Sequence, residues 1–262
     1  MGGGFEKYIG IDYSGAQTAT SSLKGLRVYT ATPATPPEEV APPPSRRKYW
    51  SRKELAEWLV EQMNGPERVL VGIDHSFSFP LKYFEHHELQ HDWVEFLEFF
   101  QMCWPTAAPH MDVESIRTGK ASLLLTPSEG NSRWRRLVEV RAGAKSAFHF
   151  DVPGSVAKST HAGLPWLLYI MMRTKEKPPH FWPFHGWEIP AGASVIAEVY
   201  PALWSKDFPR EGRTDDQHDS YCVTAWMRES DRDGSLPSFL GPKLTIRERE
   251  TAKIEGWILG VR

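Results

Sequence analysis

Acidic residues occur in four separated segments of the chain, at positions where the local pattern calls for apolar residues. Two of these segments contain the sequence Gly-Ile-Asp, and their carboxylates belong to Asp12 and Asp74. Glu198 lies within a third, otherwise apolar run, and Asp216 and Asp219 follow a helix-start signal. Acidic side chains are rarely buried without a partner or a metal ion. We therefore predict that these five residues are catalytic and converge at one site.

Converging carboxylates favour divalent-metal chemistry. Phosphodiester hydrolysis uses two divalent ions about 3.5–4 Å apart, one activating water and one stabilising the leaving oxygen. Mg²⁺ and Mn²⁺ prefer carboxylate and water oxygens, so we predict either ion as the cofactor. The predicted metal ligands are Asp12, Asp74, Glu198 and Asp219. Asp12 is the bridging candidate, and Glu198 or Asp216 would orient water.

Each acid also has an ordinary structural explanation. Asp12 could cap the turn before Gly15, and Asp74 could cap the turn that follows it. Glu198 could face solvent on an edge strand, and the helix dipole favours Asp216 near a helix N-terminus. Asp219 lies deeper in the same helix, where capping no longer explains it. The sequence leaves these alternatives open.

Basic residues in the middle of the chain could hold the phosphates of a substrate. The predicted substrate-binding residues are Arg133, Arg135, Arg136, Lys145 and Lys158. Arginine beside tryptophan suits phosphates and stacked bases, although a solvated face around one core tryptophan is the alternative. The stretch Arg46–Lys48 is a second basic candidate. We predict nucleic acid as the partner.

Two strands must place the first two acids side by side. Residues 7–13 and 68–74 are apolar runs typical of buried strands, and a capping box at Ser51 begins a helix between them. A strand–helix–strand connection favours a parallel pair with a right-handed crossover. Asp12 and Asp74 would then lie at the same ends of neighbouring strands, about 5 Å apart. Sites in open α/β sheets form at these carboxyl ends.

Further elements complete the predicted sheet and its helices. Residues 18–23 and 26–32 predict a hairpin, and the prolines over 31–45 indicate an extended, exposed connector. Residues 194–200 predict the last strand, and a capping box at Thr214 begins a helix that runs to about residue 230.

We predict a single α/β domain with its core at about 7–75 and 194–262, and a large insertion at about 76–193 between the fourth and fifth strands. Helices are predicted over 92–102, 163–173 and 246–255, and extended segments over 121–126, 144–151 and 180–189.

Composition is typical of a soluble globular protein. The chain has 262 residues, 40% of them hydrophobic, with a net charge of −2. Its two cysteines, Cys103 and Cys222, have no disulfide-framework spacing, which favours a reducing compartment. With no signal peptide and no apolar run of about 20 residues, we expect a cytoplasmic protein with no membrane association. The 11 tryptophans leave room for a homodimer surface.

Several motifs occur in the same order as in a known group of proteins. They are Ile9–Asp12, Val71–Asp74, Ala197–Pro201, Asp216–Asp219, Lys145–Phe148, Gly154–Val156, Gly163–Pro165, Trp182–Phe184 and Glu255–Ile258. With them, the chain resembles the ribonuclease H-like superfamily, and more closely the predicted-nuclease family known as domain of unknown function number 429. The chain departs at Ser220, where alanine is frequent in related helices.

The resemblance implies a mixed five-stranded sheet flanked by helices, with acids on the first strand, the fourth strand and the last helix. It also implies a metal-dependent nuclease, a hydrolase acting on nucleic acid. Two alternatives remain: a phosphotransferase like the actin-like ATPases and sugar kinases, which have two duplicated domains, and a non-catalytic nucleic-acid or protein-binding module. The sequence does not distinguish DNA from RNA.

Overall fold

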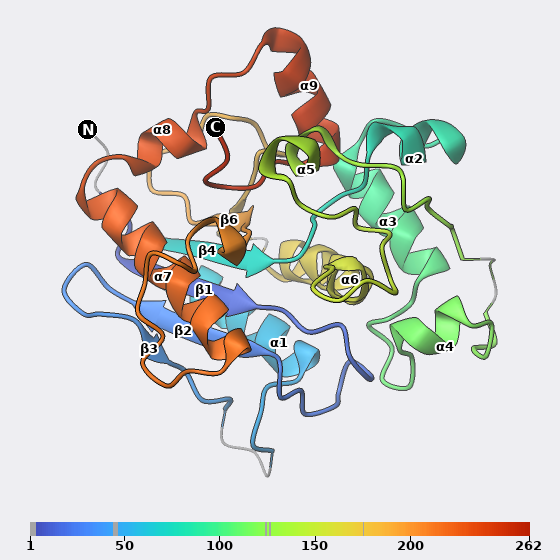
Figure 1. The fold of residues 1–262 in the computed structure, drawn as a ribbon, viewed down its shortest axis with the longest axis horizontal. Coiled ribbons are helices and arrows are strands. Elements are labelled where there is room, and N and C mark those ends of the chain that lie inside the picture. Colours follow the sequence, from blue (N-terminus) through green and yellow to red (C-terminus); the bar gives the residue numbers. More distant parts are fainter. Residues whose placement is uncertain (1–3, 44–46, 124, 126, 175) are drawn as a thin grey trace.

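A mixed six-stranded sheet forms the centre of the molecule (Figure 1). The structure is a computed structural model that describes residues 4–43, 47–123, 125, 127–174 and 176–262. The strands are β1 (Lys7–Asp12), β2 (Arg27–Ala31), β3 (Glu38–Glu39), β4 (Val69–Asp74), β5 (His180–Trp182) and β6 (Val195–Glu198), in the spatial order β3-β2-β1-β4-β6-β5. Strands β1, β4, β6 and β5 are mutually parallel, and β2 and β3 are antiparallel to their neighbours. The α/β class with a mixed sheet is confirmed, but the sheet has six strands where five were expected.

Helices cover both faces of this sheet. They are α1 (Arg52–Asn64), α2 (Leu81–His86), α3 (Trp93–Cys103), α4 (Val113–Arg117), α5 (Leu137–Ala142), α6 (Ala157–Arg173), α7 (Asp215–Arg232), α8 (Leu236–Leu240) and α9 (Ile246–Glu255), with a 3₁₀ turn at Pro201–Leu203. The capping boxes predicted at Ser51 and Thr214 are present at the starts of α1 and α7. Within the described part of the chain, no helix is both long and apolar enough to cross a bilayer.

The alternation of side chains along the strands assigns residues to the two faces of the sheet. Ile9 and Ile11 join the larger hydrophobic core, which includes apolar residues of α1 and α6. Tyr8 joins a second core with Val223 of α7. Because side chains alternate with a period of 2, Asp12 projects from the face that α7 covers. Figure 1 shows α7 crossing the strands on that side.

The glycines of the two Gly-Ile-Asp motifs let α7 lie directly on the sheet. A Cβ atom at Gly10 would lie 2.3 Å from Thr224 Oγ1, and one at Gly72 would lie 2.7 Å from Val199 and 2.9 Å from Val223. All three distances are shorter than van der Waals contact, so a side chain at either position would push the helix away. Each glycine precedes its aspartate by two residues on the same face. The motif therefore combines close helix packing with a carboxylate at the strand end.

The hairpin predicted near the start of the chain is wrong in its first strand. Residues 18–23 form no strand. Their backbone bonds to the start of α1, since the Leu23 amide donates to the Trp50 carbonyl and the Lys53 amide donates to the Ala19 carbonyl. The segment is thus tied to the start of α1 instead of to a strand. β2 also pairs with β3. That strand lies inside the proline-rich connector, at residues that are not proline and so keep a backbone N–H. Residues 44 and 45 of that connector lie outside the described residues.

The regular secondary structure of the insertion is mainly helical, and its predicted extended segments are largely wrong. Residues 144–151 form turns around buried Ala147 and Phe148, and of 180–189 only β5 is a strand. The described residues of 121–126 contain no strand, while 124 and 126 lie outside them.

Helix α6 begins six residues before the predicted Gly163 and contains Pro165 in its interior. Proline lacks the amide that would bond to the carbonyl four residues earlier, which is that of His161. Thr106 Oγ1 donates to this carbonyl instead, at 2.8 Å. Thr106, in the connection between α3 and α4, therefore supplies the hydrogen bond that the His161 carbonyl lacks within the helix.

Candidate functional site

Asp12 and Asp74 stand side by side at the carboxyl ends of β1 and β4. They are paired in the parallel register of the two strands, and neighbouring strands lie about 4.8 Å apart. Paired residues project from the same face of a sheet, so both carboxylates point toward the α7 side. The predicted adjacency of these two strand ends is confirmed.

Helix α7 brings two further acids to this edge. Ser220 Oγ donates to the Gly10 carbonyl at 2.8 Å and to the Arg27 carbonyl at 3.2 Å, which fixes the first turns of the helix over β1 and β2. Asp219 immediately precedes this anchor, and Asp216 lies one turn earlier on the same helix face. Ser220 thus supplies hydrogen bonds that hold the start of α7, and with it the two acids, against the sheet.

The four carboxylates repel one another in a partly buried setting. Burial raises the pKa of Asp12, and the charges of Asp74, Asp216 and Asp219 raise it further. Burial also raises the pKa of Asp74, followed by the charge of Asp219. Arg27 acts on Asp12 in the opposite direction, but its guanidinium is 2.9 Å from the carboxylate of Glu39.

These four acids have no neutralising contact among the described residues. Asp12, Asp74, Asp216 and Asp219 form no hydrogen bond or salt bridge there. By contrast, Asp215 at the exposed start of the same helix forms an ion pair with Arg210. Partly buried carboxylates without a cation are costly, so this edge of the sheet is suited to binding a positive ion.

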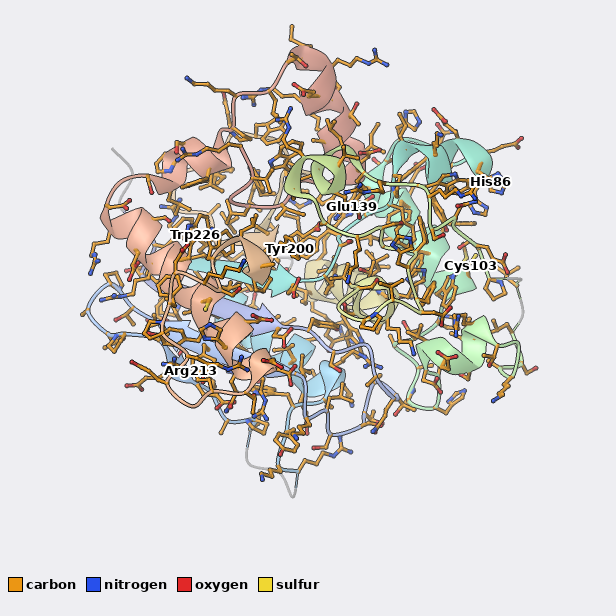
Figure 2. All side chains as sticks on the ribbon, in the orientation of Figure 1. His86, Cys103, Glu139, Tyr200, Arg213 and Trp226 are labelled. Atoms are coloured by element: carbon orange, nitrogen blue, oxygen red, sulfur yellow. The ribbon has the colours of Figure 1, made fainter. Side chains whose placement is uncertain are left out.

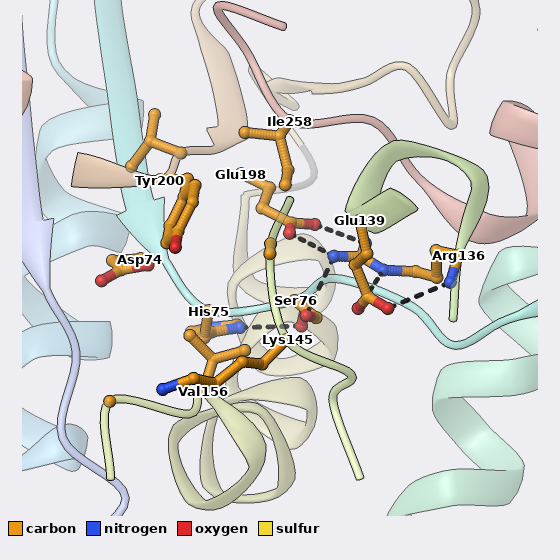
Figure 3. A pocket seen from close by; sticks show the side chains of 13 residues that line it. Asp74, His75, Ser76, Arg136, Glu139, Lys145, Val156, Glu198, Tyr200 and Ile258 are labelled. Atoms are coloured by element: carbon orange, nitrogen blue, oxygen red, sulfur yellow. Dashed lines mark hydrogen bonds and ion pairs between the residues drawn. The ribbon is translucent and has the colours of Figure 1, made fainter. Parts of the chain in front are cut away.

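Glu198 lines the same pocket as Asp74, but its carboxylate is bound by Arg136, which departs from the predicted ligand set. It pairs with Ile73, and not with Asp74, in the β4–β6 register. Its side chain therefore projects from the opposite face, where Arg136 donates to both carboxylate oxygens, at 2.7 and 2.5 Å. The Phe77 amide donates to the same carboxylate at 3.1 Å. Figure 3 shows Asp74 pointing away from this ion pair.

Arg136 also differs from its predicted role. It is 1% exposed and cannot reach a bound nucleic-acid backbone. Besides Glu198, it contacts Glu139 at 2.9 Å and donates to the Ser76 hydroxyl at 3.0 Å (Figure 3). It also donates to the Glu255 carbonyl at 3.0 Å. Arg136 therefore joins α5, β6 and the end of α9 as part of the protein interior.

Two of the remaining basic residues predicted to bind substrate line pockets together with one or more of the acids. Lys158 lines an open cleft together with Asp12 and Asp216, and forms a 3.0 Å ion pair with Glu114. Lys145 lines a smaller pocket together with Asp74.

Two arginines are less well placed to contact a substrate phosphate near the acids. Arg135 is exposed, and its guanidinium donates to the carbonyls of Glu139 and Ala144 at 2.6 and 2.7 Å. Arg133 is exposed and lines neither of these pockets. Of the second basic stretch, Lys48 lies over the Tyr49 ring, and Arg46 lies outside the described residues.

Two functional candidates were not predicted from the sequence. Tyr200 lines the same pocket as Asp74, and its pKa is raised by burial and by the charges of Asp74 and Asp219. It lies between α7 and α5 in Figure 2. Arg52 is fully buried and donates to the carbonyls of Ser14, Ala16 and Gln17, at 2.7–3.0 Å. Its position in a helix start gave no signal that it would hold the loop after β1.

The chemistry of the donors fits a magnesium or manganese ion. Among the described residues, no group of three or more Asp, Glu, His and Cys side chains forms a ready-made metal cage. Mg²⁺ is usually held by one or two carboxylates together with waters and substrate phosphates. Asp12 and Asp74 supply such a pair. Asp216 and Asp219 are near enough that their charges raise the pKa of Asp12.

Comparison of the chain with protein-family models, with curated proteins and with solved structures gave no match.

Proposed function

We propose that this protein is a metal-dependent nuclease of ribonuclease H-like architecture. One observation carries the proposal: acids from β1, β4 and α7 gather on one face at the carboxyl ends of parallel strands, and no described residue forms an ion pair with them. Ion binding outside the carboxyl ends of strands is general for open α/β sheets. The motif resemblance to the predicted-nuclease family supports the same assignment.

The proposed roles follow from where the side chains lie. Asp12 and Asp74 would hold Mg²⁺ or Mn²⁺, with Asp219 completing the set. The bound ions would activate water and stabilise the leaving oxygen of a phosphodiester. Asp216 faces the cleft that Lys158 also lines, so it would orient water while Lys158 contacts a phosphate. Glu198 is not retained as a ligand.

The pocket beside Asp74 gives the nucleic acid a second point of contact. Lys145 and Tyr200 both line it. A lysine ammonium suits a backbone phosphate, and a tyrosine ring suits a base or sugar. We therefore propose that the strand passes from the Lys158 cleft, over the acids, to the Lys145 pocket.

The two alternatives gain less support. The phosphotransferase alternative requires a duplicated sheet, and the described residues form one sheet of six strands. The non-catalytic alternative requires acids that are neutralised by arginine or lysine. Glu198 meets that description, but Asp12, Asp74 and Asp219 form no ion pair with an arginine or lysine in the part of the chain that the structure describes.

Cleavage assays with defined substrates test the proposal. The purified protein would be incubated with fluorescent single-stranded DNA, duplex DNA, RNA, an RNA–DNA hybrid and a branched DNA junction, in Mg²⁺, Mn²⁺ or EDTA. We expect cleavage of at least one substrate that requires the metal and falls about 10³-fold or more in Asp12→Asn and Asp74→Asn.

Asp215→Asn is the matched control, because Asp215 is exposed at the start of α7 and paired with Arg210. It should retain activity within about twofold. Cleavage that persists in Asp12→Asn would indicate a contaminating nuclease. Calorimetric titration of Mn²⁺ separates the remaining cases, since metal binding without cleavage would favour the non-catalytic module, and no metal binding would overturn the proposal.

A further inference from the structure

A third, small cavity lies under the sheet, on the face opposite to the acids. Its walls come from the end of β1, from β4, and from α1 and α6. Most of the lining is aliphatic, including Leu55, Leu59 and Ile170. Such a cavity would normally be filled by apolar side chains or contain no polar groups.

Three polar atoms without partners belong to residues that line this cavity. They are the Tyr13 hydroxyl, Arg52 Nε and Trp166 Nε1, all buried and without a hydrogen bond in the described structure. The three side chains are 8%, 0% and 6% exposed, respectively. A buried donor without an acceptor costs about 1–3 kcal/mol, so three of them around one cavity point to a ligand that accepts hydrogen bonds.

The charge of the cavity favours an anion. Arg52 carries a buried guanidinium whose terminal nitrogens donate only to backbone carbonyls. Asp112 acts on it electrostatically, but burial lowers the pKa of Arg52 more than Asp112 raises it. Asp112 also caps α4, where its carboxylate accepts from the Ser115 amide. The positive charge of Arg52 is thus not neutralised by a carboxylate contact.

His75 also lines the cavity, and its orientation leaves the three donors available. Its Nδ1 is 2.9 Å from the Ser76 carbonyl, which assigns the ring proton to that nitrogen. Its Nε2 faces the backbone of α6, since a Cβ at Gly163 would lie 2.4 Å from it.

We propose that this cavity binds a monoatomic anion, chloride in physiological solution, through Tyr13, Arg52 and Trp166. Three unpartnered N–H and O–H groups on residues that line one cavity, one of them on a buried guanidinium, suit a halide, which accepts hydrogen bonds from several directions. The site is separate from the acids and does not depend on nuclease activity. Because Arg52 holds the loop after β1 and Tyr13 follows Asp12, the anion would stabilise the strand end that carries the metal-binding acid.

Halide titration tests this site in the intact protein. Thermal unfolding would be followed in sodium gluconate, with gluconate replaced stepwise by chloride or bromide at constant ionic strength. We expect the Tm to rise saturably, by about 2–4 °C once the halide exceeds its Kd several-fold. Crystals grown in sodium bromide should show an anomalous peak beside Arg52 Nε.

A conservative variant makes the result specific. Trp166→Phe removes one donor with little loss of volume, and it should abolish the saturable Tm rise or shift its midpoint about tenfold or more. Trp58→Phe is the control, because Trp58 lies on α1, packs on Trp50 and is not part of the cavity wall. It should leave the halide response intact.

Two results would overturn the proposal. One is a Tm that does not change with halide while the bromide crystals show a water without anomalous signal in the cavity. The other is a halide response that Trp166→Phe retains in full, which would place the binding elsewhere.

Discussion

Thr224 of α7 lies directly over Gly10 of β1, so close that a Cβ at position 10 would be 2.3 Å from the threonine hydroxyl. This contact decides how near the helix comes to the sheet. It also decides how near Asp216 and Asp219 come to Asp12. The acidic site therefore depends on a residue that has no side chain.

Gly10→Ala should lift α7 from the sheet. Overpacking of this kind destabilises a protein by about 1–3 kcal/mol, and the displaced acids should bind Mn²⁺ more weakly. Urea unfolding and calorimetric metal titration measure the two effects. Gly25→Ala is the control, since a Cβ there is 3.6 Å from its nearest atom, in Asp216. Equal stability of both variants would contradict the packing argument.

Asp12→Asn should stabilise the metal-free protein while removing its activity. The carboxylate of Asp12 is repelled by Asp74, Asp216 and Asp219, and a neutral amide of the same shape relieves this repulsion. Substitutions that relieve strain at functional sites commonly add about 0.5–2 kcal/mol. Unfolding in EDTA at neutral pH measures the gain, and Asp215→Asn should show none. A loss of stability in Asp12→Asn would argue for a structural role.

Arg136→Met should be strongly destabilising. It would leave Glu198 and Glu139 buried without their cation, and breaking a buried ion pair costs about 3–5 kcal/mol. Arg135→Met, which changes an exposed neighbour, should cost less than about 1 kcal/mol. Adding Glu198→Gln to Arg136→Met should recover part of the loss. If the loss in the double variant equals the sum of the losses in Arg136→Met and Glu198→Gln, the two residues are not energetically coupled.

Thr106→Val should weaken α6 at its proline. The substitution removes the donor to the His161 carbonyl, and an unsatisfied buried carbonyl costs about 1–3 kcal/mol. Pro165→Ala restores a backbone amide that can bond to the same carbonyl. The double variant should therefore be more stable than Thr106→Val alone, as measured by urea unfolding. Strict additivity of the two substitutions would count against this compensation.

His161 should make folding stability depend on pH in the acidic range. Its ring is buried against aromatic residues that include Phe79 and Trp104, and burial lowers its pKa to about 3. The unfolded chain binds a proton near pH 6.5 while the folded protein does not. The stabilising contribution is therefore complete above pH 6.5 and is lost as the pH falls toward 3.

Urea unfolding at several pH values measures this effect. Between about pH 6 and 4, stability should fall by about 1.4 kcal/mol per pH unit more steeply in the wild type than in His161→Phe. His91→Phe is the control for a histidine with greater exposure. Equal slopes in the wild type and His161→Phe would contradict the buried neutral state.

The sequence alone determined the strand pair at the centre of the site. Two apolar runs that end in Gly-Ile-Asp and are joined by a capped helix commonly form neighbouring parallel strands. The connection between such strands is short and right-handed. Asp12 and Asp74 then must lie together. The capping box at Thr214 likewise set the start of α7 through local hydrogen bonds.

Only the tertiary structure decided in which direction the Glu198 side chain points. β6 is buried on both faces, so its residues do not alternate between apolar and polar, and the sequence does not show which way Glu198 points. A register that pairs it with Ile73 turns it away from Asp74 and toward Arg136. A shift of one residue would have reversed every side chain of the strand. Long-range contacts, which local sequence patterns do not encode, fixed that choice.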